Sequence, residues 1–183
     1  MNKLAFRAVA AVLLAAAVPA QAELPVGAKA PNFSAQAALA GKTFGFNLRA
    51  ALSKGPVVLY FYPKAFTKGC TLEAHEFAEM TPEFAKLGAT VIGMSNDDID
   101  TLKRFSTEAC RDKFAVAAAT PAIVEAYDAE LVSDGKKTGL TERTSYVIDR
   151  KGRIVFVHSD LDYKDHVRLT LAAVKSLHAR QRR

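Results

Sequence analysis

The sequence predicts a single α/β domain in which helices flank a central mixed sheet. Segments of strand character alternate with segments of helical character along residues 23–183, and no repeat, low-complexity block or long linker interrupts them. That stretch is long enough for one domain with its own hydrophobic core and too short for two. We therefore expect one continuous domain.

Residues 1–22 have the pattern of a secretory signal peptide. Lys3 and Arg7 flank the start of an Ala- and Leu-rich run that reaches Pro19, and the small residues Ala20-Gln21-Ala22 close it. The uncharged run is shorter than the roughly 20 apolar residues that a membrane-spanning helix needs. We expect cleavage after Ala22, a mature chain of residues 23–183 with no membrane association, and a periplasmic or secreted location.

The first half of the domain contains the clearest strand signal. After an irregular lead with Pro25 and Pro31, residues 41–48 are predicted to form a small hairpin. Residues 57–62 are an unbroken β-branched and aromatic run, which is typical of a central buried strand. Pro63 is expected to end that strand.

A helix is expected after Gly69. Its apolar side chains recur at spacings of three and four residues, as on one helix face that packs against a core, and they are Phe77, Met80, Phe84 and Leu87. Pro82 lies inside this segment and is expected to kink the helix.

The next segments continue the alternation. Residues 89–94 predict a second strand, residues 98–113 a helix and residues 114–119 a short strand. Pro121 is expected to open another short helix, because proline is favoured at the first helical position.

The last part of the chain predicts a hairpin and a closing helix. The apolar segments 146–149 and 153–157 flank Arg150-Lys151-Gly152, which reads as a turn between two strands, and an amphipathic helix starts near Lys164. A strand and helix, a second strand and helix, an antiparallel hairpin and a final helix form the order of a thioredoxin-like fold. This is the fold we predict.

The charge of the chain gives little indication of a partner. The formal net charge is +6, and removal of Lys3 and Arg7 with the leader lowers it to +4. The remaining excess is concentrated at Arg180, Arg182 and Arg183, where cations complement the dipole of a helix C-terminus. No basic face with interleaved aromatic residues is evident, so we expect no nucleic-acid binding.

Cys70 carries the strongest chemical signal in the sequence. It is predicted to lie in the first turn of a helix directly after a buried strand, where free backbone N–H groups stabilise an anion. The thiolate is the reactive form of cysteine, and a nearby cation also favours it. Arg143, which precedes a strand that starts near Ser145, is the candidate for that cation.

Two loop residues complete the candidate site. Thr67 precedes Cys70 by three residues, close enough for its hydroxyl to form a hydrogen bond with the thiolate or a bound substrate. Pro63 fixes the backbone at the end of the strand and removes one N–H group, so we expect it to shield the thiolate from water.

The spacing Pro-x-x-x-Thr-x-x-Cys at Pro63, Thr67 and Cys70 resembles the active-site motif of the peroxiredoxins. Residues 60–64, 69–73 and 143–149 add a resemblance to the branch called bacterioferritin comigratory protein or peroxiredoxin Q. The resemblance runs from about Val26 to the C-terminal helix and implies a thioredoxin-like fold. Arg143 corresponds to the active-site arginine of the family.

This resemblance implies a thiol peroxidase that reduces hydrogen peroxide and organic hydroperoxides without a cofactor. The Cys70 thiolate would attack a peroxide oxygen, release water or an alcohol, and become a sulfenic acid. Arg143, Thr67 and backbone N–H groups would stabilise the charge that develops as the O–O bond breaks. The resemblance also implies re-reduction by a thioredoxin-like dithiol and a monomeric protein.

The resemblance also bears on Cys110, the second of the two cysteines. One subgroup of the branch has its resolving cysteine five residues after the first, but His75 occupies that position here. Another subgroup has it in the following helix, where Cys110 is expected, so we predict a Cys70–Cys110 disulfide. A disulfide needs Cα atoms within about 7 Å, which predicts local unwinding of the Cys70 helix. The alternative is a one-cysteine peroxidase in which Cys110 is a buried apolar residue.

Three other interpretations compete with the peroxidase. Exported domains often contain a structural disulfide, a thioredoxin-like oxidoreductase would share the fold, and the fold also serves as a binding module. The chain contains no Cys-x-x-Cys motif, which argues against the oxidoreductase. We expect a structural role for Glu73, and no metal site, since the histidines show no ligand spacing: His75, His158, His166 and His178.

Overall fold

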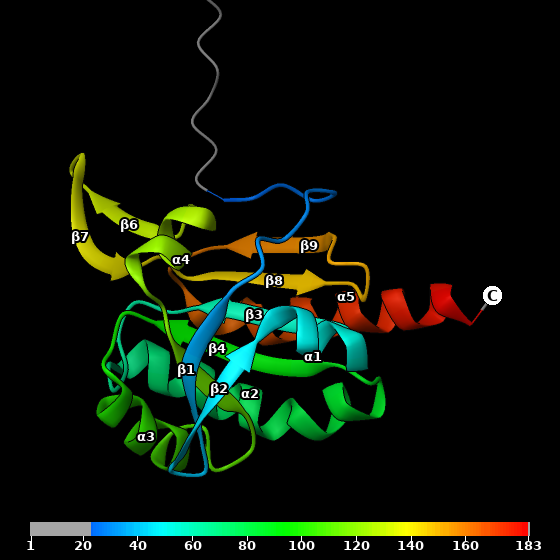
Figure 1. The fold of residues 1–183 in the computed structure, drawn as a ribbon, viewed down its shortest axis with the longest axis horizontal. Coiled ribbons are helices and arrows are strands. Elements are labelled where there is room, and N and C mark those ends of the chain that lie inside the picture. Colours follow the sequence, from blue (N-terminus) through cyan, green and yellow to red (C-terminus); the bar gives the residue numbers. More distant parts are fainter. Residues whose placement is uncertain (1–22, 183) are drawn as a thin grey trace, which may run out of the picture.

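The computed structural model describes residues 23–182 (Figure 1). The predicted signal peptide, residues 1–22, lies outside these described residues and remains a prediction. Among the described residues, no helix combines the length and the apolar character that crossing a membrane requires.

A mixed sheet of seven strands forms the centre of the domain. The strands are β1 (Ser34–Leu39), β2 (Lys42–Asn47), β3 (Val57–Phe61), β4 (Thr90–Ser95), β5 (Ala115–Ala118), β8 (Thr144–Ile148) and β9 (Ile154–Ser159). Their spatial order is β2-β1-β5-β4-β3-β8-β9, in which β3, β4 and β5 are parallel and the other pairs are antiparallel. The predicted α/β class with a central mixed sheet is confirmed.

Helices cover both faces of this sheet (Figure 1). They are α1 (Leu48–Lys54), α2 (Lys68–Lys86), α3 (Ile99–Glu108), α4 (Pro121–Ala126) and α5 (His166–Gln181), with a 3₁₀ turn, η1 (Tyr163–Asp165), before α5. Two hydrophobic clusters form the core, one on each face. The first contains apolar side chains of α2, α3 and α5, and the second contains those of α1 and α4.

Strand β3 shows how the sequence produces these two clusters. All five of its residues are buried, as predicted. Because successive side chains of a strand point to opposite faces, Val58 and Tyr60 join the first cluster while Leu59 and Phe61 join the second. On α2, Phe77 and Phe84 are buried in the first cluster, and the helix continues through Pro82 to Lys86.

The N-terminal hairpin begins earlier than residues 41–48. Strand β1 pairs with β2 through a turn at Ala40 and Gly41, whose φ angles are 49° and 72°. The Ala-rich β1 lacks the β-branched residues that mark a strand, which is why the prediction placed an irregular lead there. Helix α1 was also not predicted, although the Asn47 side chain caps it by accepting from the Ala50 N–H.

A separate two-stranded sheet, β6 (Glu130–Ser133) and β7 (Lys136–Thr141), was not predicted either. Its turn is Asp134-Gly135, with φ angles of 51° and 71°. This dipeptide is a strong signal for a tight hairpin, but the flanking residues are mostly polar and exposed.

Helix α3 ends at Glu108, so the prediction of a helix to residue 113 is wrong. Beyond it, Arg111 and Asp112 adopt positive φ angles of 51° and 59°, which an α-helix does not accommodate. Cys110 therefore lies in the turn after α3 rather than in the helix.

Candidate active site

Cys70 lies in the first turn of α2, where the sequence predicted it. Thr67 is the N-cap residue and makes no side-chain cap hydrogen bond, so the helix presents uncapped backbone N–H groups at this end. The first backbone bond of the helix runs from the Thr71 N–H to the Thr67 carbonyl, at 2.9 Å. Only 1% of Cys70 is exposed. The thiol is thus held in a buried and locally electropositive position.

Strand pairing brings Arg143 to this thiol. Residues Phe61 and Thr144 are opposite each other in the β3–β8 ladder, which places Arg143 beside the loop that follows β3. Its Nη2 lies 3.4 Å from the Cys70 Sγ, and its Nε donates to the Leu161 carbonyl at 2.9 Å. A Cβ added at Gly69 would lie 3.2 Å from Nη2, so the glycine leaves room for the guanidinium.

Glu73 holds the other end of the guanidinium. It lies three residues after Cys70 on the same face of α2, is fully buried, and its Oε2 accepts from Arg143 Nη1. Burial raises the pKa of Glu73 to about 8, although Arg143 opposes this shift. Arg143 has a raised pKa, because the charges of Glu73 and Cys70 outweigh its own burial. The sequence interpretation missed this pairing, and the spacing from Cys70 was the available signal.

Residues 26–157 match the family model described as the AhpC/TSA family. The chain belongs to the AhpC/TSA family. Peroxiredoxin Bcp of Bacillus subtilis (strain 168) is 30% identical over 157 residues, which cover 84% of this chain and 97% of the relative. Peroxiredoxin Bcp of Xanthomonas campestris pv. campestris is 32% identical over 127 residues, which cover 68% of this chain and 79% of the relative.

The comparison with solved structures agrees. The crystal structure of peroxidoxin BcpB from Mycobacterium tuberculosis superposes with a TM-score of 0.73 at 28% identity, and the match covers 83% of this chain and 97% of that chain. This AhpC/TSA protein thus belongs to the Bcp or peroxiredoxin Q branch, as its motifs predicted. It is a thiol peroxidase that reduces hydroperoxides.

Pro63 and Thr67 both lie in the loop between β3 and α2. The Thr67 side chain is exposed, and its hydroxyl donates to the Lys64 carbonyl at 2.9 Å. Pro63 is half-buried and lines a pocket together with the loop residues Lys64 and Phe66. Asp97 anchors this loop, because its Oδ2 accepts from the Ala65 N–H at 2.7 Å. In this peroxiredoxin, Arg143 contacts Cys70 directly, whereas the Thr67 hydroxyl bonds to the backbone of its own loop.

Cys110 is buried in the same hydrophobic cluster as Cys70, and both thiols are free. Its N–H donates to the Phe105 carbonyl at 3.0 Å. Burial raises the pKa of the Cys110 thiol, so this cysteine is protonated in the folded, reduced peroxiredoxin. Tyr60 and Tyr62 lie in the same hydrophobic cluster as both cysteines, and burial raises the pKa of each hydroxyl. The buried Tyr60 hydroxyl has no hydrogen-bond partner among the described residues.

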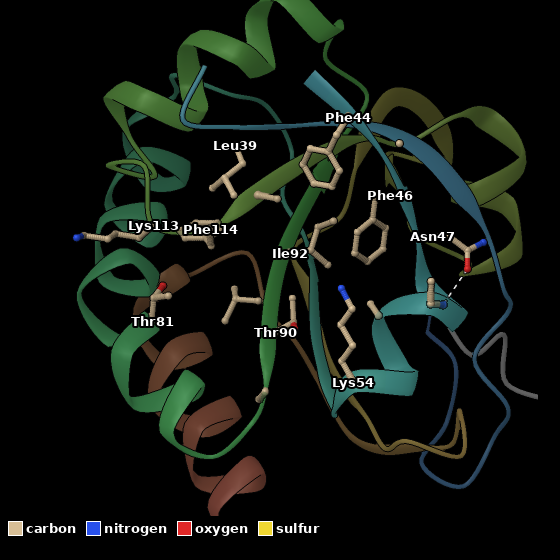
Figure 2. A pocket seen from close by; sticks show the side chains of 16 residues that line it. Leu39, Phe44, Phe46, Asn47, Lys54, Thr81, Thr90, Ile92, Lys113 and Phe114 are labelled. Atoms are coloured by element: carbon tan, nitrogen blue, oxygen red, sulfur yellow. Dashed lines mark hydrogen bonds between the residues drawn. The ribbon is translucent and has the colours of Figure 1, made fainter. Parts of the chain in front are cut away.

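A second pocket lies away from this chemistry. Figure 2 shows it beside the amino ends of β4 and β5, with Phe44, Lys54 and Lys113 among its lining side chains. Cys70, by contrast, follows the carboxyl end of β3. Residues 23–182 contain no group of three or more His, Cys, Asp or Glu side chains arranged to hold a metal ion.

Proposed function

We propose that Cys70 is the peroxidatic cysteine of this thiol peroxidase. The observation that carries the proposal is the 3.4 Å contact between Arg143 Nη2 and the Cys70 Sγ at the uncapped N-terminus of α2. A buried guanidinium and free backbone N–H groups favour the thiolate, and they also stabilise negative charge on a departing oxygen.

The reaction that this arrangement supports is a nucleophilic displacement on oxygen. The Cys70 thiolate forms an S–O bond with one peroxide oxygen as the O–O bond breaks, so the sulfur is oxidised to a sulfenic acid and the peroxide is reduced. The second oxygen leaves as hydroxide or alkoxide, takes a proton, and departs as water or an alcohol. Arg143 lies where it can balance that charge.

Both hydrogen peroxide and organic hydroperoxides are proposed substrates. The pocket beside the active-site loop combines apolar side chains of Phe66 and Leu140 with polar ones of Asn96 and Thr101. Phe66 is 40% exposed, so it presents an aromatic surface near the loop that an organic group can contact.

We propose that Cys110 resolves the Cys70 sulfenic acid as an intramolecular disulfide. Both thiols lie in one hydrophobic cluster, which supports a reaction between them. Cys110 must first leave its buried turn and ionise, and the first turn of α2 must unwind. The second candidate is a one-cysteine cycle, which the burial of Cys110 favours.

The remaining proposals concern the setting of the enzyme. The leader pattern in residues 1–22 supports export to the periplasm or the exterior after cleavage near Ala22. A thioredoxin-like dithiol is the proposed reductant of the oxidised enzyme, and a monomer is the proposed assembly.

The test compares wild type, Cys70→Ser and Cys110→Ser after one equivalent of hydrogen peroxide, by thiol counting and intact mass. We expect wild type to lose two hydrogens, Cys110→Ser to retain an oxidised Cys70, and Cys70→Ser to stay inert. A Cys70→Ser variant that reacts as fast as wild type would overturn the assignment of Cys70. A wild type that stops at the sulfenic acid would replace the two-cysteine cycle with the one-cysteine cycle.

A further inference from the structure

Four basic residues line one hollow on the surface of the domain, which we call the basic hollow. Its volume is about 600 Å³, a size typical of small-ligand sites. The four residues are Lys29, Arg49, Arg150 and Lys151. None of the described residues that line the hollow is acidic. It lies at the opposite end of β8 from Arg143, and so away from the peroxide chemistry at Cys70.

The segments that supply these charges are far apart in the sequence. Lys29 belongs to the lead before β1, Arg49 belongs to α1, and Arg150 and Lys151 form the turn between β8 and β9. Each cation alone is an ordinary exposed side chain. The fold, rather than any local motif, gathers them around one hollow.

Two hydrogen bonds attach α1 to the other two segments. The Arg49 N–H donates to the Asn32 Oδ1 at 3.0 Å, which joins α1 to the lead. The Arg150 Nη2 donates to the Ser53 carbonyl at 3.0 Å, which joins the turn to α1. The guanidinium of Arg150 is therefore held in place at the edge of the hollow.

The lead and the turn are also joined directly. The Ala30 N–H donates to the Gly152 carbonyl at 2.9 Å. Gly152 has a φ angle of 78°, and a Cβ added there would lie 3.9 Å from the Cδ1 of Leu52, so the turn rests on this buried side chain of α1. All three walls are thus attached to one another, and the basic hollow is formed without a ligand.

No carboxylate balances the charges of the basic hollow within residues 23–182. None of its four cations pairs with an acidic group within 4.0 Å there. Asp149 belongs to the same turn, but its Oδ1 accepts from the N–H groups of Lys151 and Arg153, at 2.9 Å each. Like charges that line one hollow repel one another, and an anion bound among them removes that repulsion.

The kinds of cation indicate the class of anion. A guanidinium presents a planar fork of N–H donors that matches two oxygens of a phosphate group, and a lysine adds a compact charge. Arg150 uses Nη2 on the Ser53 carbonyl, and a guanidinium has five N–H donors, so others are available to a ligand. Two arginines and two lysines exceed the charge of a single carboxylate, whereas a diphosphate has enough negative charge to match them.

We propose that the basic hollow binds a small free anion with two linked phosphate groups. Arg49 and Arg150 donate to the phosphate oxygens, and Lys29 and Lys151 supply further positive charge. The site goes beyond the proposed function, because it involves none of the residues around Cys70.

The binding test uses pyrophosphate and residues 23–183 at constant ionic strength, by isothermal titration calorimetry and amide chemical shifts. We expect saturable binding, with shifts concentrated at Lys29, Arg49 and Lys151. Arg49→Gln and Arg150→Gln are each expected to weaken binding about fivefold, the upper end for an exposed ion pair. Arg150→Gln also removes the bond to Ser53, so Arg49→Gln decides the test if Arg150→Gln is unstable.

Arg180→Gln is the matched control. It removes the same charge from an exposed arginine in the last turn of α5, outside the basic hollow. We expect its Kd for pyrophosphate to stay within about twofold of wild type. Equal weakening by Arg180→Gln and Arg49→Gln would overturn the proposal, because pyrophosphate would then respond only to net charge. Absence of saturable binding would overturn it as well.

Vesicles test the other source of phosphate, an anionic lipid headgroup. None of the exposed large apolar side chains of the described residues lines the basic hollow, which favours a free anion over a membrane surface. We therefore expect no Arg49-dependent sedimentation with vesicles of phosphatidylcholine and phosphatidylglycerol. Vesicle binding that Arg49→Gln abolishes, without binding of pyrophosphate, would overturn the assignment to a free anion.

Discussion

The Nη2 of Arg143 lies 3.4 Å from the Sγ of Cys70, although the two residues are 73 positions apart in the chain. The antiparallel pairing of β3 with β8 creates this contact, because it aligns the end of one strand with the beginning of the other. The thiol therefore has beside it a cation from a residue that directly precedes a distant strand.

Replacement of Arg143 tests the electrostatic part of the mechanism. Arg143→Gln removes the charge, and we expect the rate constant with hydrogen peroxide to fall by about 10²–10³, as for the loss of a preorganised donor. Stopped-flow measurement of the first oxidation checks this. Arg168→Gln, which removes an exposed arginine paired with Asp165, is the control. An Arg143→Gln rate within twofold of wild type would contradict this role.

The space beside the guanidinium can be tested at Gly69. Gly69→Ala places a Cβ 3.2 Å from Arg143 Nη2, so we expect the guanidinium to shift and the peroxide rate to fall about fivefold. Gly45→Ala adds a Cβ with nothing within 4 Å and should leave the rate unchanged. Equal rates for the two variants would show that the Arg143 position tolerates the added methyl group.

Phe66 offers a test of substrate discrimination. Phe66→Ala removes an exposed ring that packs edge-on against Phe105 and lies 5.3 Å from the Arg104 guanidinium carbon. We expect KM for cumene hydroperoxide to rise about tenfold, since apolar contact with the organic group is lost, while the rate with hydrogen peroxide changes little. The ratio of the two steady-state parameters checks this. A parallel change for both peroxides would point to a general defect of the loop.

His166, the first residue of α5, is fully buried, and it gives a prediction about stability and pH. Its pKa in the folded chain is lowered from 6.5 to about 4, so its contribution is present above pH 6.5 and is lost as the pH falls towards 4. In urea unfolding, the stability advantage of wild type over His166→Asn should therefore shrink by roughly 2 kcal/mol between pH 7 and pH 4.5. Thr170→Val, which removes a buried hydroxyl from the same helix, is the control, and its difference from wild type should not vary with pH. A pH-independent difference for His166→Asn would contradict the assignment of a neutral buried ring.

Local sequence patterns were sufficient for the parts of the fold with strong periodicity. The apolar run of β3 and the spaced aromatic residues of α2 predict both elements, and their junction predicts the position of Cys70. The β6–β7 hairpin was not predicted because its strands are short and mostly exposed, and α1 was not predicted because its seven residues are too few to show a clear periodicity. The end of α3 was not predicted, because no glycine in the sequence marks the positive φ angles at Arg111 and Asp112.

The active site also contains residues that the sequence predicted and residues that it did not. Cys70 and Arg143 were predicted from motif residues, and the structure brings them together. Glu73 was interpreted as structural and His166 was considered only as a metal ligand. The side chains of Glu73 and His166 come within 3.8 Å of each other through packing between α2, β8 and α5. No local spacing in the sequence encodes a contact between residues that far apart.

In the proposed catalytic cycle, the burial of Cys110 puts disulfide formation in competition with over-oxidation of Cys70. After the first oxidation in this cycle, the sulfenic acid of Cys70 would persist until α2 opens and Cys110 leaves the core, and a second peroxide molecule would compete during that interval. Conversion of Cys70 to the sulfinic acid, which ends catalysis, is first order in peroxide, whereas the opening is not. In the proposed cycle, the enzyme would therefore turn over repeatedly at low peroxide and inactivate itself at high peroxide, and the rate at which α2 unwinds would set the concentration that separates the two regimes.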